Sequence, residues 1–315
     1  MTGIRPGSLR SCPPVPDHVT IREVCLRDGL QIEDPIPLSA KLELLEAVVA
    51  TGVREIEATA FVSPSKVPAL ADAAALAAEL PRLRQSHGVE FSALVAGPGG
   101  AGRAIAAGMA SIEYVVSAAD GHSQSNVGRS TAESTDLIAD IARIAHENDA
   151  TIEVIIATAW DCPFDGPTDP KRVLDIATAA VEIGADRLAI ADTIGTTTPR
   201  RVTSLIELLR PVIGDLPLGA HFHNTRGAGL ASAYAAVVAG VTRLDSSVGG
   251  LGGCPFAPGA SGNIATEDLV YMLRDSGIGV DVDLQAAIHA AGVASKAVGH
   301  DLPSALLRAG DRILS

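Results

Sequence analysis

A regular alternation of short β-branched segments with longer alanine- and leucine-rich stretches limits the possible fold of this chain more than any other feature. We expect eight of the short segments to be strands: residues 19–24, 54–59, 90–95, 111–116, 151–157, 187–192, 218–223 and 243–248. The intervening stretches, such as 38–52 and 168–184, place apolar residues at helical spacing. Eight consecutive strand–helix pairs predict an α/β fold, a (β/α)₈ TIM barrel.

The connections between these segments support the barrel. Four predicted helices end in a glycine shortly before the next strand, at Gly52, Gly108, Gly184 and Gly240, as expected for helix ends in the left-handed conformation. A doubly wound sheet is the alternative, but its glycine-rich phosphate loop after an early strand is not found. Residues 96–102 are rich in glycine and are expected to begin a helix. We expect a loose leader over 1–18, the barrel over 19–280, and a C-terminal helical extension over 281–315 that packs on the barrel.

The composition of the chain limits its possible binding partners and its cellular location. The chain has 315 residues, of which 47% are hydrophobic and only 3% aromatic, so its core must be mostly aliphatic. A net charge of -13 argues against a nucleic-acid partner. The proline-rich N-terminus has no apolar signal segment, and no run of 18 apolar residues predicts a membrane span. The four cysteines form no C-x-x-C pair, which favours a reducing, cytoplasmic location.

Ionisable residues are predicted to gather where the strands end, at the edge of the barrel that carries active sites. His221 and His223 are two residues apart, so on a strand both side chains point to the same face. Asp28 follows the first strand, which in a closed barrel lies two strands from the histidines. Nitrogen and carboxylate ligands without cysteine suit Mg²⁺ or Mn²⁺, or else Co²⁺ or Zn²⁺. The alternative is that each histidine has a structural role.

Three further charged residues occupy the same edge. Arg27 can face a developing oxyanion, or it can form a simple ion pair with Asp28. Glu57 and Asp192 can orient the histidines or move protons, or they can form structural ion pairs with arginines inside the barrel.

The segment 246–263, after the last strand, contains six glycines and two prolines and is expected to be a mobile loop over the site. Cys254 at its centre can deliver or accept a proton, or it can be incidental. Asn263 ends the loop, where capping of the following helix is its simplest role.

These residues lie in motifs that resemble the hydroxymethylglutaryl-CoA lyase family, part of a wider superfamily of metal-dependent barrel lyases and condensing enzymes. The matching segments, from about residue 19 onward, are RDGLQ at 27–31, IEATAFVSPSKVP at 56–68, ADTIG at 191–195, HFHN at 221–224 and SVGGLGGCPFAPGASGNIATEDLVYML at 247–273. The GLGGCP loop is the most specific of them.

The resemblance implies that Asp28, His221, His223 and Asn263 bind a divalent cation, usually Mg²⁺ or Mn²⁺, with no permanently bound organic cofactor. It implies an enolate-stabilising role for Arg27, supporting acidic roles for Glu57 and Asp192, and proton transfer by Cys254, with His221 also counted among the catalytic residues. The substrate-binding residues that it suggests are Arg27, Gln31, Asn126 (in a loop after the fourth strand) and Arg226. The implied reaction is a retro-Claisen cleavage of an acyl-CoA to acetyl-CoA and a keto acid, and family members are often homodimers.

The chain departs from the family around the second histidine. Asn224, Arg226 and Ala228 stand where the better-known lyases have aspartate, tyrosine and glutamine. The substrate could therefore be 3-hydroxy-3-methylglutaryl-CoA or another 3-hydroxyacyl-CoA such as citramalyl-CoA. The alternatives are a condensing acyltransferase of the isopropylmalate or citramalate synthase kind, a keto-acid aldolase, and a catalytically silent ligand-binding barrel.

Overall fold

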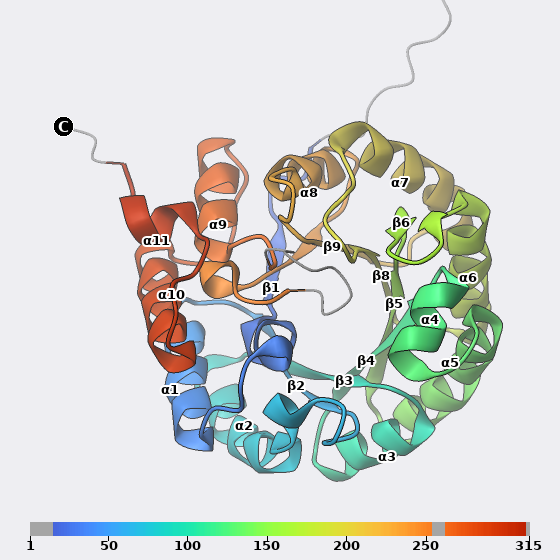
Figure 1. Ribbon diagram of the computed structural model, residues 1–315, viewed down its shortest axis with the longest axis horizontal. Helices are drawn as coiled ribbons and strands as arrows, with labels where there is room; N and C mark the ends of the chain where they lie inside the picture. Colours follow the sequence, from blue (N-terminus) through green and yellow to red (C-terminus); the bar gives the residue numbers. More distant parts are fainter. Residues whose placement is uncertain (1–14, 254–261, 313–315) are drawn as a thin grey trace, which may run out of the picture.

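Eight parallel strands close into a barrel in the computed structural model, which describes residues 15–253 and 262–312 (Figure 1). The strands are β1 (Thr20–Glu23), β2 (Glu55–Phe61), β3 (Glu90–Val95), β4 (Ser111–Ser117), β5 (Thr151–Ala157), β8 (Arg187–Asp192), β9 (Leu218–Phe222) and β10 (Arg243–Ser246). Around the barrel they pair in the order β1-β10-β9-β8-β5-β4-β3-β2. Each lies within or beside a predicted strand segment, so the predicted fold class is confirmed.

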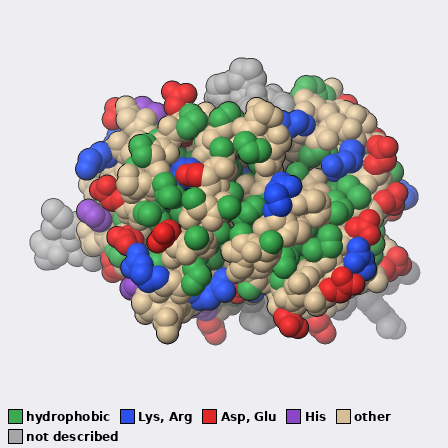
Figure 2. All heavy atoms as spheres, turned by 90° about the horizontal axis from the view of Figure 1, so that it is seen from below, with side chains coloured by type: hydrophobic (Ala, Val, Ile, Leu, Met, Phe, Trp, Pro, Cys, Tyr) green, Lys and Arg blue, Asp and Glu red, His purple; other side chains and the backbone are tan. Residues whose placement is uncertain are grey.

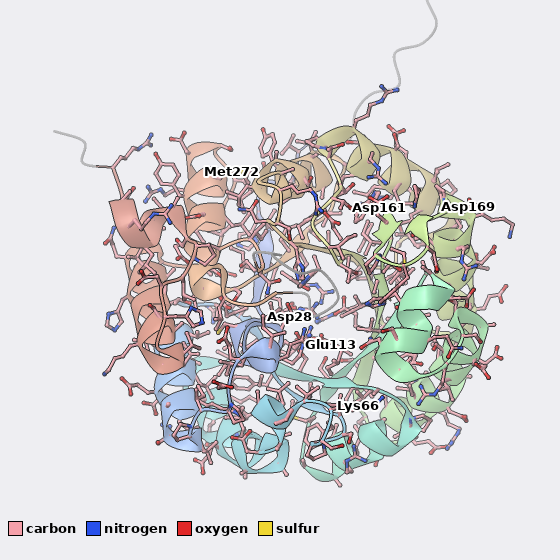
Figure 3. All side chains as sticks on the ribbon, in the orientation of Figure 1. Asp28, Lys66, Glu113, Asp161, Asp169 and Met272 are labelled. Atoms are coloured by element: carbon pink, nitrogen blue, oxygen red, sulfur yellow. The ribbon has the colours of Figure 1, made fainter. Side chains whose placement is uncertain are left out.

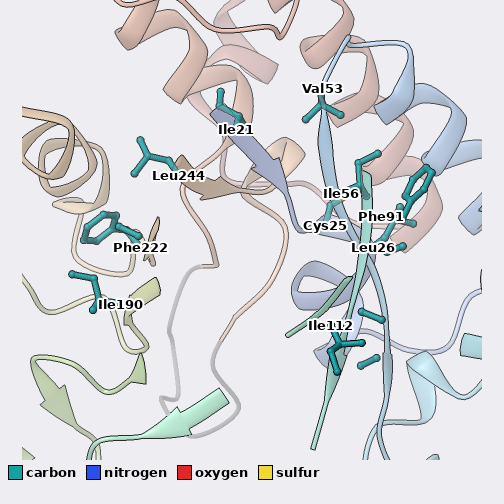
Figure 4. Packing of buried hydrophobic residues seen from close by; sticks show 14 of the residues in the cluster. Ile21, Cys25, Leu26, Val53, Ile56, Phe91, Ile112, Ile190, Phe222 and Leu244 are labelled. Atoms are coloured by element: carbon teal, nitrogen blue, oxygen red, sulfur yellow. The ribbon is translucent and has the colours of Figure 1, made fainter. Parts of the chain in front are cut away.

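Eight helices surround the strands, one after each. They are α1 (Leu38–Val49), α2 (Ala73–His87), α3 (Pro98–Ala106), α5 (Thr131–His146), α6 (Pro170–Ile183), α7 (Pro199–Ile213), α8 (Gly229–Val238) and α9 (Thr266–Asp275). The main core lies between the helices and the outer faces of the strands, where Phe91, Ile112 and Phe222 are fully buried (Figure 4). The predicted helix-ending glycines have positive φ, for example 86° at Gly184, and the glycine-rich stretch 96–102 does begin α3.

Several further helices and strands are added to the eight strand–helix pairs of the barrel. The helix α4 (Asp120–Val127) follows β4, and a small hairpin of β6 (Asp161–Cys162) and β7 (Gly166–Pro167) follows β5. After the barrel, α10 (Leu284–Val298) packs against α1 and α9 through an alanine-rich face, and α11 (Ala305–Ala309) follows it. Among the residues described, no helix is both long enough and apolar enough to cross a membrane. On the face seen in Figure 2, basic side chains lie scattered among acidic and apolar ones.

The interior of the barrel is unusually polar. Such barrels are commonly filled by layers of branched aliphatic side chains, but here Arg22, Glu113, Glu153, Arg243 and Asp245 are all buried inside. Buried charges are tolerated only when they are paired. Arg22 satisfies this requirement: its Nη1 lies 2.6 Å from Glu113 Oε1 and 2.5 Å from Glu153 Oε2, and its Nη2 lies 2.7 Å from Asp245 Oδ2. A small apolar cluster of Val115, Ile155, Ala189 and Ala191 accompanies these charged residues.

Candidate active site

The predicted site residues meet at the C-terminal end of the barrel. Strand β1 leads into a π-helical turn, Cys25–Gly29, which carries Arg27 and Asp28. His221 lies in β9, and His223 follows directly after it, with the two ring centres 5.0 Å apart. Strand β10 lies between β1 and β9, so the predicted two-strand separation is confirmed. Figure 3 shows Asp28 close to the centre of the barrel, far from peripheral residues such as Asp169.

Asp28, His221 and His223 form a group that could hold a metal ion. One ligand atom from each lies within 4.8 Å of the others. Asp28 Oδ2 is 3.5 Å from His223 Nε2 and 4.0 Å from His221 Nε2, both too long for hydrogen bonds. Neither ring nitrogen of His223 has a hydrogen-bond partner within the described chain. An unpaired buried polar atom costs about 1–3 kcal/mol, so these atoms converge on a point where a cation would satisfy them.

Asn263 reaches the same point from the far side of the loop. A β-bridge between His223 and Asn263 aligns the two backbones. The Asn263 amide nitrogen donates to Asp28 Oδ2 (2.8 Å) and to the Leu251 carbonyl (3.1 Å), whereas its buried Oδ1 has no partner among the described residues. Helix α9 begins at Thr266, and Asn263 makes no capping bond to it. The capping role considered from the sequence is therefore wrong, and the amide oxygen is a fourth candidate ligand.

The surroundings of Asp28 keep it ionised. Arg27 Nη1 donates to its Oδ1 at 2.6 Å, and Gln31 Nε2 lies 3.2 Å from the same oxygen. Burial alone would raise the pKa of Asp28, but Arg27 and the two histidines together hold that pKa well below its usual range. Gln31, predicted to bind substrate, thus contacts the carboxylate of Asp28.

A carboxylate that sequence reasoning missed orients His221. Asp245 of β10 is in register with His221, and its Oδ2 accepts a hydrogen bond from His221 Nδ1 at 3.1 Å. The same carboxylate accepts from Arg22 Nε (2.8 Å) and Nη2 (2.7 Å). With its proton on Nδ1, His221 has an unprotonated Nε2. The Nε2 lone pair points to the space between His221 and Asp28, where a metal ion could bind it. The only sequence signal for this role of Asp245 is that a carboxylate lies inside the predicted strand 243–248.

Glu57 of β2 lies beneath this group, next to Arg27. It is completely buried, and its Oε1 is 2.6 Å from Arg27 Nε. Arg27 therefore bridges the carboxylates of Glu57 and Asp28 within the barrel. Burial raises the pKa of Glu57 well above its usual value, Arg27 opposes the rise, and nearby Glu113 adds to it.

Two other predicted residues hold loops at the C-terminal end of the barrel. Asp192 ends β8 and accepts hydrogen bonds from the backbone N–H groups of Thr196 and Thr197, both at 3.0 Å, so it shapes the loop that follows. Arg226 is exposed and donates to the carbonyls of Ile194 (2.9 Å) and Gly195 (3.3 Å).

Two predictions fall elsewhere. Asn126 is exposed on α4, so its predicted position in a loop is wrong: the segment after β4 continues into two turns of helix that end at Gly128 in the left-handed conformation. Cys254 lies outside the described residues.

Comparison with known proteins agrees with this geometry. Residues 18–293 match the family model described as HMGL-like. The (R)-citramalyl-CoA lyase of Chloroflexus aurantiacus is 39% identical, over 93% of this chain and 95% of that protein. A hydroxymethylglutaryl-CoA lyase of Bacillus subtilis is 37% identical, over 92% of this chain and 97% of that protein.

Solved structures of lyases also resemble this chain. The chain superposes with a TM-score of 0.88 on an HMG-CoA lyase from Acinetobacter baumannii in complex with coenzyme A and 3-methylmalate, at 34% identity over 95% of this chain and 98% of that one. The HMG-CoA lyase structure from Bacillus subtilis gives a TM-score of 0.90 at 36% identity, over 94% of this chain and 99% of that one. The chain therefore belongs to the HMGL-like family and is a carbon–carbon lyase.

Proposed function

We propose that this protein is a divalent-metal-dependent lyase that cleaves 3-hydroxy-3-methylglutaryl-CoA, or a close 3-hydroxyacyl-CoA, to acetyl-CoA and a keto acid such as acetoacetate. The observation that carries the proposal is the convergence of Asp28, His221, His223 and Asn263 beside Arg27 at the mouth of the barrel. Relatives named as lyases of hydroxymethylglutaryl-CoA and citramalyl-CoA support the acyl-CoA class.

The proposed cation is Mg²⁺ or Mn²⁺, because the available donors are a carboxylate, two imidazoles and an amide oxygen, without a thiolate. A bound divalent cation supplies Lewis acidity toward the hydroxyl and a carbonyl or carboxylate oxygen of the substrate. Asp245 fixes the ring of His221, and Gln31 and Arg27 fix the carboxylate of Asp28. We propose no organic cofactor.

Arg27 is the proposed oxyanion donor. Breaking the carbon–carbon bond leaves negative charge on the thioester oxygen of the acetyl-CoA enolate. A guanidinium is always protonated and presents fixed N–H donors, and Arg27 is held in place by Glu57 on one side and Asp28 on the other. Removing one such donor in other enzymes slows the reaction by about 10²–10³-fold.

Two groups are proposed to handle protons. Asp192 is the candidate acceptor of the substrate hydroxyl proton, because burial raises its pKa and each of its oxygens keeps a free lone pair beside the bond from Thr196 or Thr197. Cys254, in the loop between β10 and α9, is the proposed donor to the enolate. Asn126 and Arg226 are proposed to contact the acyl-CoA. We also propose a cytoplasmic location, from the cysteine pattern, and a homodimer, from the family resemblance.

A steady-state assay tests the proposal. Purified protein would be given 3-hydroxy-3-methylglutaryl-CoA and, separately, citramalyl-CoA, with Mg²⁺, with Mn²⁺ and with EDTA, and acetyl-CoA and the keto acid would be measured. We expect metal-dependent turnover that Asp28→Ala abolishes. Asp175→Ala, which removes an exposed carboxylate from α6, should leave it intact. Absence of turnover in folded, metal-loaded protein would refute both substrates. Acetyl-CoA consumption with a keto acid would instead favour the condensing alternative.

A further inference from the structure

A chain of buried charges continues from the active site into the barrel. Arg22 of β1 binds Asp245, which orients His221, and on its other side Arg22 binds Glu113 of β4. Glu113 in turn contacts Glu57, the partner of Arg27. Glu113 therefore touches none of the proposed ligands, yet it lies at the junction between the barrel interior and Arg27. Figure 3 shows Glu113 near the centre of the barrel, close to Asp28 in projection.

Ser92 of β3 links the surroundings of Glu57 and Glu113. Ser92 of β3 is paired with Glu57 of β2, and its small side chain donates to Glu113 Oε1 at 2.5 Å. The two glutamates therefore meet across Ser92 inside the barrel. Both side chains are at most 1% exposed. Arg22 and Ser92 satisfy Glu113 Oε1, but Glu113 Oε2 and both carboxylate oxygens of Glu57 accept no hydrogen bond from the described residues.

Two ionised carboxylates in contact in a dry interior repel each other, and neither can donate a hydrogen bond. A single proton between them removes the repulsion and joins one oxygen of Glu57 to one oxygen of Glu113. The charged groups that face this pair are Arg27, Arg22, Asp245 and Glu153. Arg22 is already paired with Glu113, Glu153 and Asp245, so within the described part of the chain Arg27 is the one cation that contacts Glu57.

We propose that Glu57 and Glu113 share one proton, and that Glu113 is thereby a positioning residue that keeps Arg27 electropositive toward the reacting oxyanion. The catalytic consequence rests on the proposed function. If Glu57 were fully ionised, Arg27 would face two carboxylates, Glu57 and Asp28, and would offer a weaker field to the enolate. With the shared proton, the positive charge of Arg27 faces one carboxylate, Asp28, and remains available to the developing oxyanion.

The individual pKa directions are consistent with this arrangement. Burial and the neighbouring Glu113 raise the pKa of Glu57, whereas Arg22 overcomes the effect of burial and holds the pKa of Glu113 below its usual value. The proton therefore resides mainly on Glu57. As pH rises, the pair loses its proton and the positive charge of Arg27 is balanced by two carboxylates, Glu57 and Asp28, so kcat should fall on the alkaline side.

Infrared difference spectroscopy tests the shared proton without substrate. Glu113→Gln keeps the shape of the side chain, but its amide donates to Glu57 and stabilises the ionised carboxylate. We expect this variant, like Glu57→Gln, to lose part of the carboxylic-acid band seen in the wild type at neutral pH. The matched control is Asp245→Asn, which removes another carboxylate partner of Arg22 and should keep that component. Glu23 and Glu267, whose pKa values burial raises to about 7, contribute to the band in every variant and cancel.

Kinetics test the consequence for catalysis. Glu113→Gln should lower kcat roughly tenfold with little change in KM, and should move the alkaline limb of the kcat profile to lower pH. If that variant does not fold, Ser92→Ala provides the opposite test: loss of the hydroxyl donor raises the proton affinity of Glu113 and should move the limb to higher pH.

The proposal is overturned if the band component survives in Glu113→Gln, or if the pH profile is unchanged in both variants. If the wild type cleaves neither acyl-CoA while the band behaves as expected, the proposed function fails and the shared proton stands.

Discussion

Replacing Asp245 with asparagine is expected to weaken divalent-cation binding while leaving every proposed ligand in place. The Asp245 carboxylate accepts three hydrogen bonds, one from His221 Nδ1 and two from Arg22. Asparagine offers one acceptor oxygen, and its NH₂ group would face a donor. His221 would then lose its fixed orientation or move its proton to Nε2, the nitrogen that faces Asp28.

The size of the effect follows from these contacts. Loss of the carboxylate behind a metal-binding histidine lowers metal affinity about 10–100-fold, which is about 1.4–2.7 kcal/mol. The variant should also be less stable, because a partner of buried Arg22 loses its charge. Arg22 keeps Glu113 and Glu153, so we expect the lower end of the range for a broken buried ion pair, about 3 kcal/mol.

Calorimetric titration with Mn²⁺ would compare the wild type, Asp245→Asn and Glu153→Gln. The last variant removes a carboxylate from the same guanidinium, at 2.5 Å, but contacts no histidine. It should therefore share the stability loss and keep the wild-type affinity. Equal affinity in Asp245→Asn and the wild type would refute the role given to Asp245, and equal weakening in both variants would show that the effect comes from the network as a whole.

Three further predictions concern other parts of the molecule. Burial raises the pKa of Glu23 from 4.5 to about 7, so its contribution to stability is full below pH 4.5 and is lost as pH rises through 7. The loss is about 3 kcal/mol, and in urea unfolding Glu23→Gln should show a correspondingly smaller fall in stability. Phe222→Ala should lower the free energy of unfolding by about 3–5 kcal/mol, because Phe222 is fully buried and stacks on Trp160. Arg226→Ala should raise KM for the acyl-CoA more than it lowers kcat in steady-state assays.

The fold and the central candidate ligands were predictable because they depend on local periodicity. Runs of β-branched residues predict the strand segments, and the barrel places the C-terminal ends of all its strands on one rim. Given that rule, the spacing of His221 and His223 was enough to put both imidazoles in the mouth beside Asp28, and the structure agrees. Helix α4, by contrast, has little apolar periodicity, which explains why the sequence around Asn126 predicts a loop.

The ionic interior was not predictable, because it depends on register between strands far apart in the sequence. Arg22 and Asp245 are 223 positions apart, yet they are paired in adjacent strands. Read alone, a charged residue at an alternate strand position looks like the solvent side of a half-buried strand. In a closed barrel that side is the interior, so the charges that look exposed in the sequence are those that support the site.

The residues that depart from the family motif lie apart from this support. Asn224 accepts a hydrogen bond from the Gly229 backbone at 3.1 Å, at the start of α8, and Arg226 ties the loop after β9 to the loop after β8. Neither contacts Asp28 or Asn263, whose positions are set by the turn after β1 and by the bridge to His223. Changes at these rim positions can therefore alter which acyl group is accepted without moving the ligands. We therefore infer that the charged interior positions the proposed ligands, and that the loop after β9 is the part of the rim where differences in substrate among such lyases should be sought.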